Sequence, residues 1–205
     1  TVLNDEVRSI DVVSRTIETR SERLQYDFLV GASGASHSYF GHDDWAGDAP
    51  GLKTLEHEFD LRRRILTAFE RAELESDPVS RTDWLRFAIV GGGPTGVELA
   101  GSVVEIARHT LRGEFRRIRP ETAEVHLIEA GPRLLAGMRE ASSESARRQL
   151  ETMGVRVHTG TPVTAIDSAG NITTKDVPYM VNSTDVAMPV GSPTGSVDTA
   201  LALAL

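Results

Sequence analysis

The sequence predicts an α/β protein whose core is a parallel β-sheet covered by helices. Between residues 85 and 158, short apolar runs alternate with segments of helical periodicity in the order β-α-β-α-β, which is the pattern of a parallel sheet. A glycine-rich stretch follows the first of these apolar runs and opens the next helical segment, as in Rossmann-like βαβ units. At about 150 residues per domain, 205 residues correspond to one domain or one and a fraction.

A small antiparallel β-meander is expected before this sheet. Short strands are predicted within residues 7–17, and a further extended run covers residues 26–30, with a polar turn at 21–23 between them. Residues 37–51 are expected to form a loop, because they combine glycines, a pair of aspartates and a proline with aromatic residues.

Three helices are predicted from apolar positions spaced three and four residues apart. The first covers about 52–75 and is ended by Asp77-Pro78. The second runs from the glycine-rich stretch to about Leu111. The third is expected to be capped by Ser142 or Ser143 and to end at Met153, before Gly154.

Short runs rich in β-branched residues predict the strands of the parallel sheet. They are residues 87–90, 125–128 and 155–158, and a further strand is predicted at 163–167. After Asp167 the sequence becomes rich in Gly, Ser, Thr and Pro, and no element is expected there.

Composition excludes several classes of protein. The formal charge of -8 argues against nucleic acid as the main partner. The absence of cysteine excludes disulfide scaffolds, thiolate zinc sites and dithiol chemistry in this chain. No apolar run approaches the ~18 residues of a transmembrane helix, and the apolar end at 201–205 is far too short. The cluster of His37, His42, Asp43 and Asp44 fits no standard spacing, so no metal site is predicted.

The glycine-rich stretch carries the most specific chemistry. Gly91, Gly93 and Gly96 fit the G-x-G-x-x-G pattern in its required place, between an apolar strand and a helix. The first glycine permits the tight turn, the second lets the backbone approach a pyrophosphate, and the third allows close packing of helix and strand. A helix N-terminus attracts phosphate without a basic side chain. The alternatives are a bare glycine turn and an S-adenosylmethionine-binding fold.

Two acidic residues are candidates for the same site. Glu129 ends the second strand, where a carboxylate accepts hydrogen bonds from the adenosine ribose and repels a 2′-phosphate, so NADH is favoured over NADPH. Arg133, four residues on, weakens that preference. A solvated strand end is the alternative for Glu129. Glu98 is interpreted either as an acid in the first helical turn that favours the helix dipole or as a catalytic residue that faces the nicotinamide.

These stretches together resemble type II NADH dehydrogenases, the single-subunit NADH:quinone oxidoreductases of the FAD- and NAD-dependent pyridine nucleotide oxidoreductase superfamily. The resemblance covers about residues 7–167. It rests mainly on two motifs, the strand and Ala-Ser-Gly loop at 26–35 and the glycine loop at 91–101. Further similar stretches are His37–Gly41, Pro50–Leu55, the helix around 62–66, and Glu129–Leu135.

The resemblance implies hydride transfer from NADH to FAD and onward to a quinone. It places an incomplete FAD-binding domain at 1–50 and an NAD-binding domain at 51–167, with 168–205 unassigned and loop-rich. By position it implies that FAD is contacted by Ala32, Ser33 and Gly34. It implies that NAD(H) is contacted by Gly91, Gly92, Gly93, Pro94, Thr95 and Gly96, and by Glu129, Ala130 and Gly131, with Glu98 near the nicotinamide.

Partners and location follow from the same resemblance. Full-length relatives are expected in the cytoplasm or on the cytoplasmic face of the membrane, which they reach through segments absent from these residues, and a homodimer is compatible with the family. Two other functions remain open from the sequence. One is a stand-alone, non-catalytic NAD(H)-binding module, and the other is part of another flavoprotein reductase, such as a ferredoxin reductase.

Overall fold

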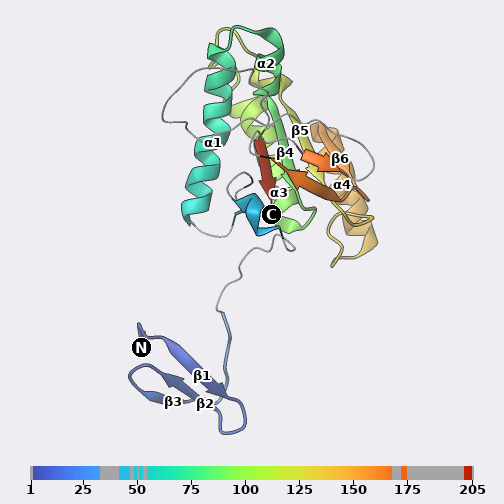
Figure 1. Cartoon of the computed structure of the whole chain (residues 1–205). Helices are drawn as coiled ribbons and strands as arrows, with labels where there is room; N and C mark the ends of the chain where they lie inside the picture. The colour runs from blue at the N-terminus through green and yellow to red at the C-terminus, as the bar shows by residue number, and fades with distance from the viewer. Residues whose placement is uncertain are drawn as a thin grey trace. The chain divides into compact units, whose positions relative to one another are not determined.

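The protein is described from a computed structural model that defines residues 2–32, 42–46, 49, 51–52, 55–167, 172–174 and 201–204. The chain divides into two compact units, Thr1–Ala35 and Ser36–Leu205 (Figure 1). The first contains a small antiparallel sheet, and the second contains the parallel sheet and the glycine loop. The assignment of these parts to FAD and NAD domains stays a prediction.

The N-terminal unit is a three-stranded antiparallel meander in the order β1-β2-β3. Its strands are β1 (Val7–Asp11), β2 (Thr16–Thr19) and β3 (Arg23–Gln25). The predicted meander is therefore confirmed, but the strand expected at residues 26–30 is wrong. The ladder ends at Gln25, and Phe28 and Val30 that follow are 94% and 85% exposed. Strand propensity is not enough without a neighbouring strand to hydrogen-bond with.

The second unit is built on a parallel sheet in the order β6-β5-β4-β9. The central strands β4 (Arg86–Val90) and β5 (Glu124–Ile128) and the outer strand β6 (Val155–His158) lie where the sequence predicts them. Ala88 pairs with His126 and His126 with Arg156, so the three strands run in register. The α/β fold class with a parallel sheet is confirmed.

The strand β9 (Leu201–Ala204) was not expected, and it pairs in parallel with β4. A hairpin of β7 (Val163–Ile166) and β8 (Ile172–Thr174) also forms, of which only the first strand was predicted. No element was assigned to residues 168–205 from the sequence, so β8 and β9 were missed there. These strands are three and four residues long, and they lie in a segment whose Gly, Ser, Thr and Pro content is typical of loops.

Helices connect and cover the strands. They are α1 (Leu55–Leu74), α2 (Pro78–Asp83), α3 (Pro94–Glu105) with its π-helical extension η2 (Ile106–Thr110), and α4 (Glu140–Met153), with single turns η1 (Asp43–Ala46) and η3 (Pro120–Thr122). Asp77 begins a second helix by accepting the Ser80 N–H at 2.8 Å. Within the described residues, none of these helices has the length and apolar character needed to cross a membrane.

The start predicted for α4 is wrong. The helix begins at Glu140 with Arg139 as its N-cap, so neither Ser142 nor Ser143 caps it. Ser143 is buried instead, and its hydroxyl donates to the Leu134 carbonyl at 2.6 Å. This contact fixes the helix against the loop that precedes it.

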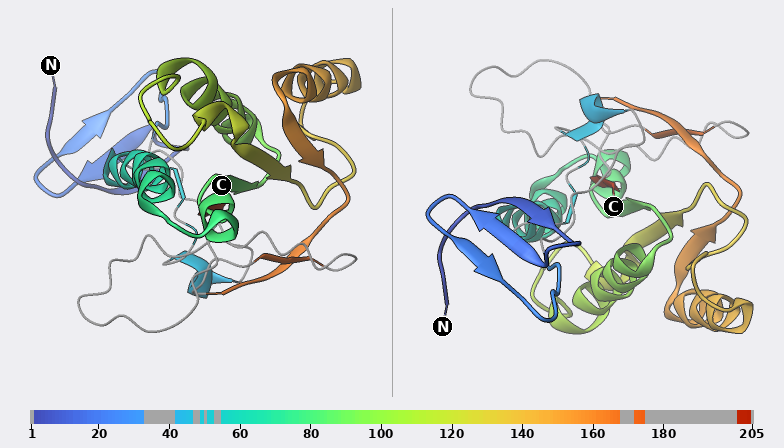
Figure 2. Two further views of the ribbon diagram at one scale, coloured as in Figure 1. Left: turned by 90° about the horizontal axis from the view of Figure 1, so that it is seen from above. Right: turned by 90° about the horizontal axis from the view of Figure 1, so that it is seen from below.

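The sheet has two differently covered faces. Helices α1, α3 and α4 contribute to one apolar cluster with Phe87, Ile89, Val125, Leu127 and Val155. On the other face, Trp45 of η1 and the isoleucines of the β7–β8 hairpin pack with Ala88 and Ile128. Figure 2 shows α3 and α4 on one side of the strands and η1 with the hairpin on the other.

Candidate functional site

The glycine loop begins directly at the carboxyl end of β4. Gly91 has a φ of 114°, a conformation that costs free energy for residues with a Cβ. Its N–H donates to the Ile128 carbonyl of β5 at 2.8 Å. The tight turn that the motif predicts is therefore present, and it is tied to the neighbouring strand.

Gly93 is the open position of the loop. It is the N-cap of α3 with φ -72° and ψ -178°, a conformation that any residue can adopt. It is exposed, and a Cβ added there would have no heavy atom within 4 Å. Glycine is therefore not required at position 93 by the backbone or by packing within the described residues. The Gly93 backbone is therefore open to close approach among the described residues, as contact with a pyrophosphate would need.

The first turn of α3 follows at once. Pro94 is the first helical residue, where its missing N–H costs nothing and its fixed φ favours the helix. Thr95 is half-buried and Gly96 is buried. The N-terminus of α3 thus faces the open side of Gly93 with the partial positive charge of a helix end.

The end of β5 is joined to the glycine loop by Glu129. One carboxylate oxygen accepts the Gly92 N–H at 2.6 Å, and the other accepts the Gly131 N–H at 2.5 Å. The Glu129 backbone is itself held, because its N–H donates to the His158 carbonyl at 2.8 Å and its carbonyl accepts from Thr161 at 3.0 Å. The predicted residues of the two strand ends are therefore brought together, with Ala130 exposed beside them.

Further residues of the loop after β5, which sequence reasoning missed, also contact the glycine loop. Leu135 donates its N–H to the Gly92 carbonyl at 2.8 Å. Leu134 is 1% exposed, and its Cδ2 would lie 2.7 Å from a Cβ at Gly92. Leu135 has a φ of 51°, and no feature of the sequence predicts this left-handed conformation. Only the central glycine of the Gly-Gly-Gly run hints that a second segment packs here.

Arg133 serves this same loop. Its guanidinium donates to the carbonyls of Ala136 and Met138 at 2.7 and 2.9 Å. Arg133 also lines a hollow of about 620 Å³, together with Thr159, which follows β6, and with Glu140 and Glu144 of α4. The Arg133 guanidinium is therefore hydrogen-bonded within its own loop.

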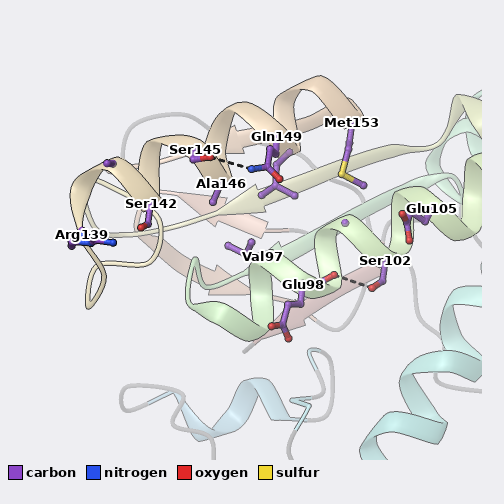
Figure 3. Close-up of a pocket in the computed structure, with 13 residues that line it drawn as sticks. Val97, Glu98, Ser102, Glu105, Arg139, Ser142, Ser145, Ala146, Gln149 and Met153 are labelled. Carbon is purple, nitrogen blue, oxygen red and sulfur yellow. Dashed lines mark hydrogen bonds between the residues drawn. The ribbon is translucent and has the colours of Figure 1, made fainter.

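Glu98 is exposed on α3. The expectation that it lies in the first helical turn is wrong, because the helix begins at Pro94 and its first turn contains no acid. Together with Arg139 and Met153 of α4 it lines a groove of about 770 Å³ between the two helices (Figure 3). None of the residues 91–96 lines that groove.

The residues predicted to contact FAD belong to the N-terminal unit. Ala32 is exposed there, and Ser33 and Gly34 lie outside the described residues. The glycine loop and the end of β5 thus form the candidate site of the second unit.

Comparison with known proteins agrees with this geometry. Residues 1–188 match the model of the pyridine nucleotide-disulphide oxidoreductase family. The chain is 41% identical over 195 residues to the type II NADH:quinone oxidoreductase Ndh of Mycobacterium tuberculosis, covering 93% of this chain and 42% of that protein. It is 44% identical over 179 residues to NdhA of the same organism, covering 85% and 38%. The chain therefore spans about two fifths of the length of these relatives.

Solved structures share the fold. NDH2 from Plasmodium falciparum in complex with NADH superimposes with a TM-score of 0.65 at 21% identity, covering 86% of this chain and 37% of that one. A ferredoxin reductase from Rhodopseudomonas palustris gives 0.52 at 22% identity, covering 83% and 36%. At such identities the likeness concerns the fold alone. The family match over most of the sequence goes further: this chain belongs to the pyridine nucleotide-disulphide oxidoreductase family.

Proposed function

We propose that this chain is the NADH-binding portion of a flavin-dependent NADH dehydrogenase that passes electrons to a quinone. The observation that carries the proposal is the open approach to Gly93 at the N-terminus of α3, because a pyrophosphate needs close contact with the backbone there. The two mycobacterial relatives bear the name type II NADH:quinone oxidoreductase. Their similarity supports the same chemistry for the whole protein.

The residues present fit the pyridine nucleotide. Gly93, Thr95 and Gly96 would hold the pyrophosphate at the helix N-terminus, and Glu129 would accept from the adenosine ribose. The nicotinamide supplies the hydride, and the flavin is the group that accepts it. Glu98, exposed on the second turn of α3, would face the nicotinamide side of the bound nucleotide. The flavin-side residues would be Ala32, Ser33 and Gly34.

The structure also supports a preference for NADH over NADPH. The Glu129 carboxylate at the strand end would repel a 2′-phosphate. Arg133 is the nearby cation in the sequence, but its guanidinium is engaged by two carbonyls of its own loop. Titration of the protein with both nucleotides tests the preference, and equal affinities would remove it.

The glycine loop can be tested by Gly93→Val. The valine has room in the ligand-free protein and an allowed backbone conformation, so the fold should persist. Its side chain would occupy the approach of the phosphates, and NADH affinity measured by calorimetry should fall at least about tenfold. Gly31→Val is the matched control, because Gly31 is an exposed glycine with equally open surroundings in the N-terminal unit. Unchanged affinity in Gly93→Val would make the loop a structural turn.

The flavin part of the proposal is tested separately by visible absorbance. Purified protein of a flavoenzyme shows the flavin bands and oxidises NADH in the presence of a quinone. A colourless protein that nevertheless binds NADH would favour the alternative, a non-catalytic NAD(H)-binding module. Location at the cytoplasmic face of the membrane and a homodimer remain proposals from the family.

A further inference from the structure

The loop after β5 and the glycine loop are joined through Gly92. This residue is not one of the three glycines that the G-x-G-x-x-G pattern requires. Gly92 donates its N–H to Glu129 and accepts from Leu135 through its carbonyl. A Cβ at Gly92 would lie 2.9 Å from a Glu129 carboxylate oxygen and 2.7 Å from Leu134 Cδ2. The two loops therefore pack against each other at Gly92, where a side chain would not fit.

Both oxygens of the Glu129 carboxylate accept hydrogen bonds where the two loops meet. Each oxygen accepts one backbone N–H, from Gly92 and from Gly131. Hydrogen bonds from backbone N–H to an ionised carboxylate are stronger than neutral ones. The bond from the Gly92 N–H fixes the peptide between Gly91 and Gly92, and the Leu135 N–H holds the next peptide through the Gly92 carbonyl. Together they set the backbone that leads into Gly93, the position at which the ligand is expected to approach.

We infer that Glu129 is a positioning residue, which clamps the glycine loop and the loop after β5 into the arrangement that binds the nucleotide. This inference rests on the proposed function and deepens it. A contact between Glu129 and the ribose would act only on nucleotides that carry the ribose hydroxyls. The clamp acts on any nucleotide with a pyrophosphate, because it sets the geometry of the loop itself.

The two roles can be separated with Glu129→Gln and two ligands. Glutamine has nearly the same shape, but its amide nitrogen would present a donor to one of the two N–H donors. The ligands are NADH and an NADH analogue whose adenosine ribose lacks both hydroxyls, each titrated by calorimetry into the 205-residue chain. The clamp predicts that the variant loses about 10- to 100-fold in affinity for both ligands, from the loss of a charge-assisted hydrogen bond.

Each outcome of this experiment decides a different point. A loss confined to NADH, with the analogue bound as tightly as by the wild type, would overturn the clamp and leave the ribose contact. A wild-type protein that binds neither ligand would overturn the proposed function together with the inference. Glu114→Gln, at an exposed glutamate in the turn after η2, is the matched control and should change neither affinity.

A measurement without ligand supports the comparison. In the ¹⁵N–¹H spectrum of the free protein, the amide signals of Gly92 and Gly131 should both shift in Glu129→Gln, while the amides of α1 stay in place. Unshifted glycine amides would show that the clamp does not form in solution and would overturn the inference. If the glutamine variant does not fold, Glu129→Asp carries the same test, because its shorter side chain keeps the charge but cannot reach both N–H groups.

Discussion

The two faces of the parallel sheet stabilise the fold by different means. On the face covered by α1, α3 and α4, the strands contribute apolar side chains, five of which are at most 2% exposed: Phe87, Ile89, Val125, Leu127 and Val155. On the opposite face, Ala88 and Ile128 lie in a small apolar cluster, but the same face also carries Arg86, Glu124, His126, Arg156 and His158. The comparison separates stability that is independent of pH from stability that depends on it.

The polar part of the second face centres on Glu124. Its carboxylate accepts from Arg156 at 2.8 Å and from Arg86 at 3.4 Å, and Arg86 also pairs with the buried Asp83 at 2.6 Å. His126 is next to it, with Nε2 3.8 Å from the carboxylate. This group links β4, β5 and β6 through charge rather than through apolar packing.

Two histidines extend the group across β5 and β6. The rings of His126 and His158 are stacked with centroids 5.4 Å apart, and their facing nitrogens are 3.2 Å apart. One ring must donate and the other accept, so the contact cannot form when both rings are protonated. Burial, with His158 and Arg156 nearby, lowers the pKa of His126 to about 4, and burial also lowers the pKa of His158.

The largest effect is expected on the apolar face. Phe87→Ala removes a fully buried ring that packs against Phe69 with centroids 5.3 Å apart, and it should lower the free energy of unfolding by about 3–5 kcal/mol. Denaturant titrations should give the same loss in mildly acidic and mildly basic buffer. Phe87→Leu is the control and should cost less, since it fills more of the cavity. A loss that grows as the pH falls would contradict the separation of the two faces.

The polar face predicts a dependence on pH. Below the ordinary histidine pKa of 6.5, the unfolded chain binds protons that the folded His126 and His158 do not. The unfolding free energy should therefore be higher above that pH. As the pH falls from 6.5 to about 4, His126 should lower it by about 1.4 kcal/mol per pH unit, and the lowered pKa of His158 acts in the same direction. Below about 4 the contribution of His126 levels off, because the folded state takes up the proton as well.

Variants identify the groups responsible for this slope. In His126→Gln the slope of the unfolding free energy between pH 6.5 and about 4 should be reduced, because the variant lacks one of the two histidines whose pKa is lowered by folding. His109→Gln, at an exposed histidine beyond α3, is the matched control and should leave the slope as in the wild type. An equal slope in wild type and His126→Gln would assign the pH dependence to other groups.

The accuracy with which the sequence predicts strands also differs between regions of the chain. The strands β4, β5 and β6 were predicted to within a residue, because each places buried apolar residues on at least one face of the sheet and local sequence displays such short runs. The strand β9 was missed because its partner β4 lies more than a hundred residues away in the chain, and four alternating Leu and Ala residues do not predict a partner. The extended run after β3 was overpredicted for the converse reason, a propensity without a partner.

The candidate site shows the same limit. Gly91, Gly93 and Gly96 were found because the motif states what each backbone position needs. The contacts of Gly92 with Glu129, Leu134 and Leu135 were not foreseeable. They depend on how the loops after two neighbouring strands meet. A run of three glycines does not show which glycine packs against the other loop and which one leaves its backbone open to a ligand.

The smallest effect is expected from Glu124 itself. Glu124→Gln removes the charge that faces Arg86 and Arg156. The Glu124 side chain is 30% exposed and that of Arg156 is 56% exposed. The loss in unfolding free energy should therefore be at most about 1 kcal/mol. Denaturant titrations in low and high salt measure it, and the difference from the wild type should shrink in high salt, because screening weakens exposed ion pairs. Glu144→Gln, which removes an exposed pairing within α4, sets the baseline. A loss as large as that of Phe87→Ala would mean that charge stabilises this sheet as strongly as apolar packing does, and the contrast between its two faces would fail.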